Sequence, residues 1–306
     1  MNCPICENPE NRPVLVEGKI VFQCVFGVGL LECQSCGFVF ADFIHPQVID
    51  YYYTYICRHD LTDDTWTDLK TQSKENGVSQ LETIRPFLPE RLGKVLDFGG
   101  GNGEAARLYL PLADEVHVSE NDPRSIDQIR EEPRLSVIDP ERLSADEFIG
   151  YFDLVVLSNV LEHMTFPVRR LTEISRILAP DGFLFVEIPN EAKVVKRNGK
   201  HAVQHIGFYS LETFEDLVRR QGSFEIVELR TCGAPVEEII EKRQIIHAFD
   251  RLDTPDGWVI RALLKNSSPK IDIPPIEMGL EDGRKALEDL SGYLLRLAND
   301  DFSLNL

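Results

Sequence analysis

Two absences narrow the function classes open to this sequence. No run of apolar residues approaches the roughly 18 that a membrane-spanning helix requires, so we expect no membrane insertion. Residues 1–6 lack the basic-then-apolar pattern of a secretion signal. We therefore expect a cytoplasmic protein, in which thiols stay reduced.

Basic residues are also in short supply. The 32 lysines and arginines are outnumbered by 51 aspartates and glutamates, which gives a net charge of −19 over 306 residues. Proteins bind nucleic acid largely through basic residues that displace counterions from phosphates, so this balance argues against a nucleic-acid partner. The length and the 43% share of hydrophobic residues suit a soluble protein with one large core and an appendage.

A glycine-dense stretch over residues 95–104, VLDFGGGNGE, is the most informative part of the sequence. The apolar run 95–98 predicts a buried parallel strand, and residues 104–110 predict the helix that follows the turn. Glycines allow the backbone to turn tightly and let a ligand lie against the main chain, and a helix N-terminus adds unpaired N–H groups. Dinucleotides and S-adenosylmethionine (SAM) both use this arrangement.

Strands and helices are predicted to alternate along the rest of the chain. Further strands are predicted over 115–120, 135–139, 152–158, 183–188, 224–229 and 258–264, and helices over 78–88, 123–130, 167–178, 211–220 and 235–249. The polar residues 60–75 are interpreted as a linker or a mobile cover. Such alternation predicts an α/β fold with a doubly wound, mostly parallel seven-stranded sheet, whose ligands lie at the carboxyl ends of the strands.

Polar residues occur at four of these strand ends. Glu120 follows the glycine turn by about twenty residues, where an acid can accept two ribose hydroxyls. A single strand-end acid could instead cap the next helix. The complete set of candidate cofactor-binding residues is Asp97, Gly99, Gly100, Gly101, Glu120, Asn121, Asp139, Ser158 and Asn159.

Two C-x-x-C pairs near the N-terminus predict a metal site. Cys3 and Cys6 form the first pair, and Cys33 and Cys36 the second. Two such pairs in a cytosolic chain match a tetrahedral structural zinc site, although incidental or disulfide-bonded cysteines are the alternative. The β-rich residues between the pairs predict a small ribbon. We therefore divide the chain into a zinc-ribbon-like module (1–60), a main domain (61–265, with a helical insertion at 231–256), and a linker with a C-terminal helix (266–306).

Three segments resemble class I SAM-dependent methyltransferases. Residues 97–103 resemble the D-x-G-x-G-x-G turn of that family, and residues 152–163 and 178–184 resemble two further motifs in the same order and spacing. Residues 101–106 also fit the weaker dinucleotide pattern G-x-G-x-x-A. The resemblance covers residues 78–230 approximately, and it implies a Rossmann-like methyltransferase fold with SAM as cofactor.

Residues 204–212, QHIGFYSLE, resemble the E-H-x-x-Y-F-S-L segment of zinc-containing sugar C-methyltransferases. That family also begins with a cysteine-rich zinc ribbon and a tyrosine-rich segment, here Tyr51, Tyr52, Tyr53 and Tyr55. The resemblance implies that His205 is the catalytic base, a role that suits a histidine at neutral pH. Gln204 stands where the family has glutamate, and we expect this protein to lack the family's large C-terminal domain. O-methylation is therefore as plausible as C-methylation, and a structural role for His205 is the alternative.

We expect an enzyme that methylates a small molecule, for example a nucleotide-linked sugar or a polyketide-type metabolite. Two alternatives are an rRNA methyltransferase with a zinc module and a non-catalytic SAM-binding module. His163 and His201 are weaker candidates for catalysis. An apolar stripe in the predicted C-terminal helix, formed by Leu287, Leu290, Leu294 and Leu297, either docks on the body of the protein or forms a homodimer contact.

Overall fold

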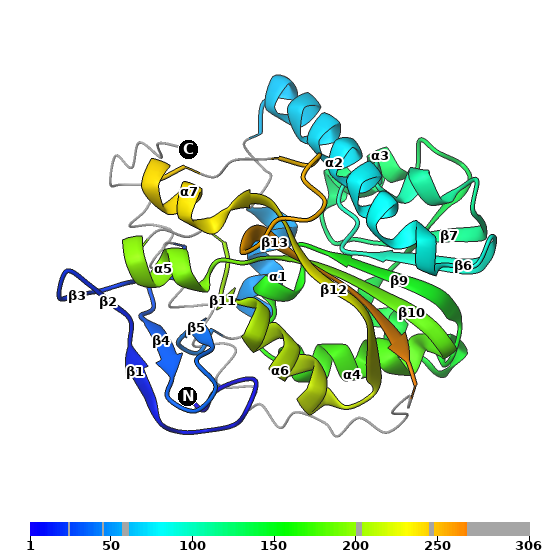
Figure 1. Cartoon of the computed structure of the whole chain (residues 1–306). Helices are drawn as coiled ribbons and strands as arrows, with labels where there is room; N and C mark the ends of the chain where they lie inside the picture. The colour runs from blue at the N-terminus through cyan, green and yellow to red at the C-terminus, as the bar shows by residue number, and fades with distance from the viewer. Residues whose placement is uncertain (24, 45, 57–60, 200–203, 245–247, 268–306) are drawn as a thin grey trace.

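A seven-stranded sheet forms the centre of the computed structural model, which describes residues 1–23, 25–44, 46–56, 61–199, 204–244 and 248–267 (Figure 1). The strands lie in the order β12-β13-β10-β9-β6-β7-β8. Their bounds are β6 (Leu92–Phe98), β7 (Ala113–Ser119), β8 (Leu135–Ile138), β9 (Phe152–Ser158), β10 (Leu178–Pro189), β12 (Phe224–Pro235) and β13 (Gly257–Asn266). Strands β6 to β10 pair in parallel, and β13 lies antiparallel between β10 and β12. The predicted fold class is confirmed.

The inner strands are apolar because both faces of the sheet are covered. Val95 and Leu96 on β6 and the whole run from residue 154 to 157 on β9 are fully buried. This is the pattern expected for parallel strands between two helical layers. The carboxyl ends of β6, β9 and β10 therefore meet at one edge, where the glycine turn begins.

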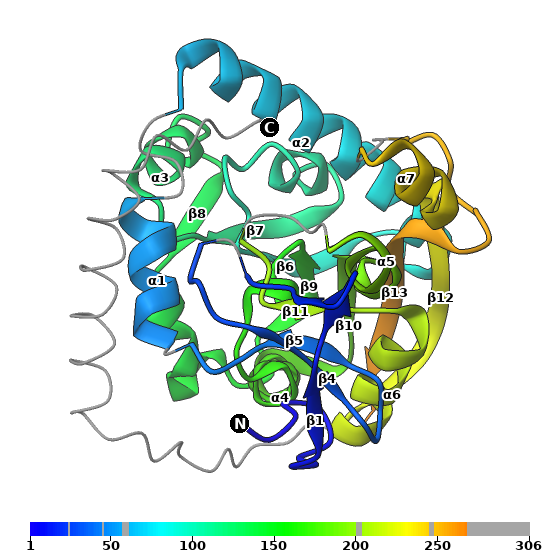
Figure 2. The same cartoon turned by 90° about the vertical axis from the view of Figure 1, so that its left-hand side faces the viewer.

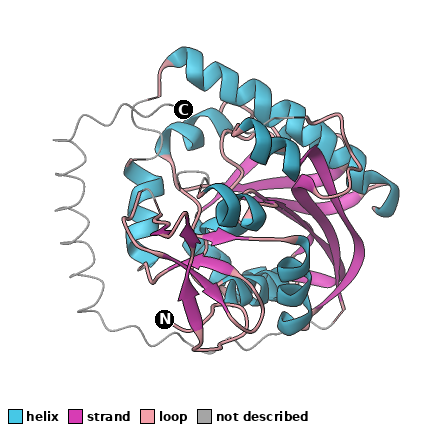
Figure 3. Ribbon diagram, turned by 60° about the vertical axis from the view of Figure 1, so that its left-hand side comes forward, coloured by secondary structure: helices cyan, strands magenta, loops and turns pink. Residues whose placement is uncertain are grey.

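Helices cover both faces of this sheet (Figures 1 and 3). Helices α4 and α6 pack together on one face, with Leu171, Ile174 and Leu217 in the core below the sheet. On the other face, α2 contributes Ile84 to a second core. The helix bounds are α1 (Pro46–Tyr55), α2 (Asp63–Ile84), α3 (Pro123–Ile129), α4 (Pro167–Ile177), α5 (Ala192–Asn198), α6 (Leu211–Gln221) and α7 (Val236–Lys242).

The predicted linker over residues 60–75 is wrong, because most of it belongs to α2. The side chain of Thr62 caps this helix by accepting the N–H of Thr65. Asp63 and Asp64 in the first turn interact favourably with the helix dipole. In the first two turns of α2, Trp66 is buried and the other residues are not. The guanidinium of Arg124 lies over the Trp66 ring. A helix with one buried side chain in two turns gives no apolar period for a sequence pattern to detect.

Two predicted helices are shorter in the structure. The stretch after the glycine turn forms only the short 3-10 helix η2 (Ala106–Tyr109), since Pro111 lacks an N–H and leaves too few residues for a stable α-helix. The helix predicted over 235–249 is α7, which ends at Lys242 because Arg243 adopts a left-handed conformation with φ of 53°. Residues 245–247 of that prediction lie outside the described residues.

The N-terminal residues form a small four-stranded sheet that includes a strand from the main domain (Figure 2). Its strands are β1 (Asn11–Pro13), β4 (Leu30–Cys33), β5 (Val39–Ala41) and β11 (Gly207–Phe208), and a hairpin of β2 (Leu15–Val16) and β3 (Lys19–Ile20) lies beside them. The ribbon was predicted, whereas its pairing with β11 was not. The domain boundaries stay a prediction.

Among the helices that the structure describes, none combines the length and the apolar character needed to cross a bilayer. The leucine stripe at residues 287–297 and His201 lie outside the described residues. Their predicted roles therefore stay predictions.

Candidate functional site

The glycine turn between β6 and β7 can be built only with glycine at several positions. Gly99, Gly101 and Gly103 have φ values of 69°, 55° and 77°, a region that residues with a Cβ rarely adopt. A Cβ on Gly99 would lie 2.7 Å from the side chain of Val160, and one on Gly100 would lie 2.7 Å from the carboxyl carbon of Asp97. The turn is therefore packed closely against Val160 and Asp97, and a side chain at Gly99 or Gly100 would force its neighbours to shift.

Asp97 is a buried carboxyl group at the end of β6, directly beside this turn. It is 2% exposed, and its Oδ2 atom has no hydrogen-bond partner among the described residues. Burial raises the pKa of Asp97 to about 7, and the nearby Glu120 carboxylate adds to the rise. A buried carboxylate oxygen without a partner is costly, so a ligand that brings hydrogen-bond donors or positive charge would relieve this cost. The amino-acid end of SAM carries such an ammonium group.

Glu120 directly follows β7 and lies across the turn. Its Oε2 atom accepts the N–H of Gly101 at 2.9 Å, and its Oε1 atom accepts those of Asn121 and Asp122 at 2.8 and 3.0 Å. The carboxylate thus fixes the shape of the glycine turn. Asp122, rather than Glu120, caps the following helix α3 by accepting the N–H of Ser125.

The other predicted residues occupy different surroundings. Asp139 is exposed and caps the 3-10 helix after β8 by accepting the N–H of Glu141, which is the capping role that the sequence left open. Asn121 is exposed as well. Asn159 follows β9 with a left-handed φ of 53°, a strained conformation that often occurs at functional sites. The oxygen of Ser158 accepts a hydrogen bond from Gln80 at 2.6 Å.

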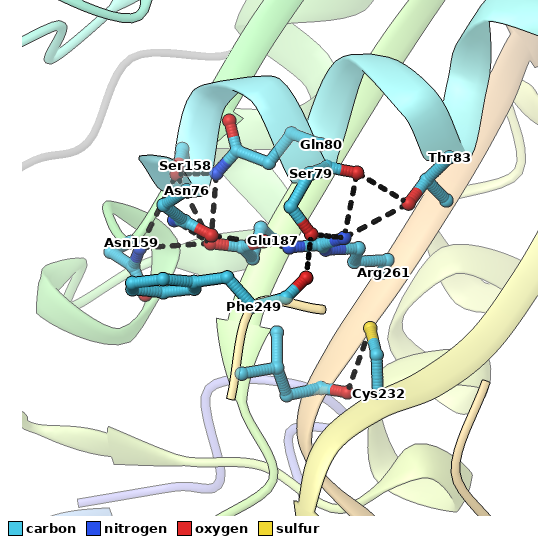
Figure 4. A network of polar contacts seen from close by, with 11 residues as sticks. Asn76, Ser79, Gln80, Thr83, Ser158, Asn159, Glu187, Cys232, Phe249 and Arg261 are labelled. Carbon is cyan, nitrogen blue, oxygen red and sulfur yellow. Dashed lines mark hydrogen bonds and ion pairs between the residues drawn. The ribbon is translucent and has the colours of Figure 1, made fainter. Parts of the chain in front are cut away.

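Sequence reasoning missed a buried ion pair below these strand ends (Figure 4). Glu187 on β10 and Arg261 on β13 face each other in register, and Arg261 Nε donates to Glu187 Oε2 at 2.7 Å. Polar side chains of α2 complete the network: Asn76 and Gln80 donate to Glu187, while Arg261 donates to Ser79, Thr83 and Asn76. The available signal was one charged residue within each of the predicted apolar strands over 183–188 and 258–264.

A second cluster of ionisable groups lies where the segments after β9 and β10 meet β11. The Nδ1 atom of His205 lies 2.6 Å from Glu191 Oε2, and its Nε2 atom lies 3.8 Å from Glu162 Oε1. His163 lies beside them, with Nε2 3.9 Å from the same Glu162 oxygen and its ring 5.0 Å from that of His205. Tyr53 approaches from α1, with its hydroxyl 2.6 Å from His163 Nδ1.

Glu162 is the most deeply buried acid of this cluster. It is 1% exposed, and neither of its carboxylate oxygens has a hydrogen-bond partner among the described residues. Burial raises the pKa of Glu162 to about 7, although the nearby His205 opposes the shift. Of the acids here, neither Glu162 nor Glu191 was a sequence candidate, because residues 162, 191 and 205 meet only in the fold.

The N-terminal module fixes the backbone that carries His205. The side chain of Gln23 donates to the His205 carbonyl oxygen at 3.2 Å, and the N–H of Ala41 on β5 donates to the next carbonyl, that of Ile206, at 2.7 Å. His205 is therefore held between the small sheet and the carboxyl edge of the large one. A change in the N-terminal module would move this histidine.

The four predicted metal ligands come together at one point. All four Sγ atoms lie within 4.8 Å of one another, with Cys3 3.6 Å from Cys36 and Cys6 3.5 Å from Cys33. Four thiolates around a tetrahedral Zn²⁺, with Zn–S bonds of about 2.3 Å, would lie about 3.8 Å apart. The arrangement therefore fits a structural zinc ion, because four protein ligands leave no position for a substrate.

A mostly parallel sheet of this order, with a glycine turn after the inner strand β6, defines a Rossmann-like cofactor-binding fold. The chain belongs to the family described as "Methyltransferase domain", whose profile matches residues 74–229, or 156 of the 306 residues. The predicted enzyme class, a SAM-dependent methyltransferase, is thereby confirmed. No curated protein matches the sequence.

Two solved structures illustrate the shared fold. One is the complex between the Haloferax volcanii Trm112 methyltransferase activator and a proposed methyltransferase, with 16% identity, a TM-score of 0.52, and coverage of 66% of this chain and 95% of the other. The second is the 1,6-didemethyltoxoflavin-N1-methyltransferase of Burkholderia thailandensis with bound 1,6-didemethyltoxoflavin and S-adenosylhomocysteine. Its identity is 14%, its TM-score is 0.50, and the match covers 78% of this chain and 99% of the other.

Proposed function

We propose that this chain transfers a methyl group from SAM to a small molecule that lies against the Glu162–His163–His205 cluster. The observation that carries this proposal is the position of Val160, which lies against the glycine turn and belongs to the short segment that leads to Glu162. One face of that segment contacts the proposed cofactor site, and its end supplies the ionisable cluster. Two reactants bound there would be held close together, which is the main requirement of a displacement at carbon.

Asp97, Glu120 and the glycine turn are the proposed cofactor-binding groups. Asp97 would pair with the amino-acid end of the cofactor, and the backbone of Gly99 and Gly101 would lie against it. Asn121, Asp139, Ser158 and Asn159 complete the proposed set, with Glu120 and Asn121 on the ribose side. SAM, when bound, supplies a methyl group on a sulfonium that leaves with the bonding electron pair.

His205 is the proposed base for the proton that leaves the acceptor. Its Nδ1 atom is held by Glu191, which orients the ring and would stabilise the imidazolium that forms, so the proton would be taken up at Nε2. The acceptor could be a nucleotide-linked sugar or another metabolite, methylated at carbon or oxygen. Zn²⁺ at the four cysteines is proposed as a structural ion only.

The test is a calorimetric titration with S-adenosylhomocysteine, with NAD as the control ligand. We expect micromolar binding of S-adenosylhomocysteine and none of NAD. The variant Glu120→Ala should weaken this binding strongly, because it removes both the proposed ribose contact and the support of the turn. Binding of NAD alone would overturn the proposal.

Turnover separates an enzyme from a binding module. The variant His205→Ala should bind S-adenosylhomocysteine like the unchanged protein but should lose methyl transfer to a panel of sugar nucleotides and hydroxylated metabolites. Turnover that survives the substitution would exclude His205 as the base. Salt-sensitive retention on RNA would instead favour the rRNA methyltransferase.

A further inference from the structure

We propose that Glu162, His163 and His205 form a second metal site, which binds a divalent transition-metal cation through the Glu162 carboxylate and the Nε2 atoms of both histidines. The site is separate from the four cysteines. The proposal rests on the proposed function only for the role of the metal in catalysis, and its binding test is independent of that function.

The distances suit three ligands around one ion. Glu162 Oε1 lies 3.8 Å from His205 Nε2 and 3.9 Å from His163 Nε2, and one ligand atom from each residue lies within 4.8 Å of the others. Ligand atoms with metal bonds of about 2.0–2.2 Å lie about 3.3–3.6 Å apart in a tetrahedral site, so a movement of a few tenths of an ångström would bring these atoms to coordination distance. Both nitrogen–oxygen distances are too long for a hydrogen bond, so the histidines do not satisfy this carboxylate directly.

The burial of Glu162 is an independent sign that a cation belongs here. Both carboxylate oxygens lack a hydrogen-bond partner among the described residues, although the side chain is 1% exposed. Buried charges in proteins are normally paired or coordinate metals. A cation between the carboxylate and the two rings would provide the missing partner.

The surroundings of the two histidines match those of metal ligands. Metal-bound histidine typically uses its other ring nitrogen to bond a carboxylate, a carbonyl or another polar group, which fixes the ring. His205 Nδ1 meets Glu191 Oε2 at 2.6 Å, and His163 Nδ1 meets the Tyr53 hydroxyl at 2.6 Å and the Gln204 carbonyl at 3.3 Å. In both rings Nδ1 is held from outside the cluster, and Nε2 faces Glu162.

The ligand set indicates the type of metal and of acceptor. Two imidazoles and one carboxylate favour Zn²⁺, Fe²⁺ or a similar ion over Mg²⁺ and Ca²⁺, and three protein ligands leave at least one position open. An acceptor hydroxyl bound there would lose its proton to water more readily, because coordination lowers its pKa. Its oxygen would then form the bond to the methyl carbon as the carbon–sulfur bond breaks. In the metal-bound state His205 is a ligand instead of the base, and the acceptor is an oxygen nucleophile.

Metal titration tests the site without reference to activity. Full-length protein is treated with a chelator until it retains one zinc per chain at the four cysteines, and Zn²⁺ or Co²⁺ is then added in a calorimeter. We expect one further equivalent to bind. We also expect cobalt at this site to lack the intense charge-transfer absorption that thiolate ligands produce, which distinguishes it from the cysteine site.

Three variants assign the ligands. Glu162→Gln and His163→Asn should abolish the additional equivalent, while Tyr53→Phe should weaken it by about tenfold because it removes only a supporting hydrogen bond. Glu173→Gln, on the surface of α4, is the matched control and should bind like the unchanged protein. Glu162→Gln keeps the shape of the side chain and removes a buried charge that has no hydrogen-bond partner among the described residues, so it should fold. Circular dichroism checks this for each variant.

Two outcomes would overturn the metal site: no binding beyond the cysteine zinc, or undiminished binding in both Glu162→Gln and His163→Asn. If S-adenosylhomocysteine still binds in either case, the proposed methyl transfer stands with His205 as the base. If the metal binds at the cluster while S-adenosylhomocysteine does not, the proposed function fails and the metal site stands.

Discussion

Asp97 is the residue whose charge depends most directly on whether a ligand occupies the glycine turn. Its pKa of about 7 is raised by burial, so the ligand-free protein holds a proton there in mildly acidic solution. We expect the affinity for S-adenosylhomocysteine to rise with pH from 6 to 8 by up to about tenfold and then level off, because the ligand ammonium requires the carboxylate form. Calorimetry in matched buffers measures this dependence.

Asp97→Asn provides the comparison. This variant should bind more weakly at pH 8 and should lose the pH dependence, whereas Asp139→Asn, at an exposed strand end, should retain it. The pH dependence of folding stability has the opposite sign to that caused by a salt-bridged acid, whose folded-state pKa is lowered. The folded-state pKa is raised, so the ligand-free protein loses stability on the order of 4 kcal/mol as pH rises from about 4 to 7, and Asp97→Asn should avoid this loss. A pH dependence that persists in Asp97→Asn would show that another group controls binding.

The Glu187–Arg261 pair gives a prediction about stability. Arg261→Met would leave a buried carboxylate with neutral partners only, which typically costs about 3–5 kcal/mol. The double variant Glu187→Gln, Arg261→Met removes both charges and should be more stable than Arg261→Met alone. Urea unfolding measures both, and a double variant less stable than the single one would contradict this account.

Which residues could be predicted depended on how far apart their contacts lie in the sequence. Asp97 and Glu120 each end a strand whose apolar pattern is local, so their place at the sheet edge followed from the pattern and the topology rule. Glu162 and Glu191 gave no such signal. Their environment depends on β11, which brings His205 to them from a distant segment.

At the scale of elements, α2 supports the glycine turn through a close approach at Gly77. A Cβ on this glycine would lie 2.9 Å from a methyl carbon of Leu108 and 3.1 Å from the Cα of Ala105, so part of the obstacle is backbone. Gly77→Ala should therefore push α2 away from the segment after the turn. The cost of about 1–3 kcal/mol for overpacking should exceed the gain of about 1 kcal/mol in helix propensity.

Thermal unfolding and S-adenosylhomocysteine titration measure both consequences of Gly77→Ala. We expect a lower melting temperature and weaker ligand binding, since the turn loses its support. Glu75→Ala, at an exposed position of the same helix, is the matched control. A variant Gly77→Ala as stable as the control would mean that α2 can shift without cost.

Elements with a strong apolar pattern were predicted closely, and elements that tertiary contacts stabilise were not. Helices α4 and α6 present apolar residues to the core at helical spacing, and the first turns of α2 bury only Trp66. The segment after Gly103 has helical composition, yet Pro111 confines it to a 3-10 turn. Residue composition alone could reveal neither the first turns of α2 nor the 3-10 turn after Gly103.

At the scale of the whole molecule, the N-terminal module and the large sheet meet at the cluster that contains His205. Strand β5 pairs with β11, and Cys3, Cys33 and Phe38 share one hydrophobic core with Tyr209 and helix α6. The sequence predicted a ribbon and a methyltransferase domain as separate units. It contained no sign of their joint sheet, because strand pairing across more than 160 residues leaves no periodic pattern.

This connection predicts that the cysteine site supports the acceptor side more than the cofactor side. Removal of its zinc, by strong chelation or by Cys36→Ser, should loosen β5 and β11 and so displace His205, since a structural zinc contributes directly to folding. The cofactor side is built on β6 and β7, which do not pair with the small sheet. We therefore expect S-adenosylhomocysteine affinity within about twofold of the unchanged protein, together with a lower melting temperature and a loss of methyl transfer.

Cys232→Ala is the control for this prediction, because Cys232 is a buried thiol on β12, outside the four-cysteine cluster, and its Sγ donates to the Val259 carbonyl. It should leave the zinc at the four cysteines and the turnover unchanged. If Cys36→Ser loses S-adenosylhomocysteine binding as completely as turnover, the two halves of the molecule fold as one unit. Equal loss of binding and turnover would mean that the zinc stabilises the whole sheet. Loss of turnover alone would mean that the zinc positions the acceptor side through β11.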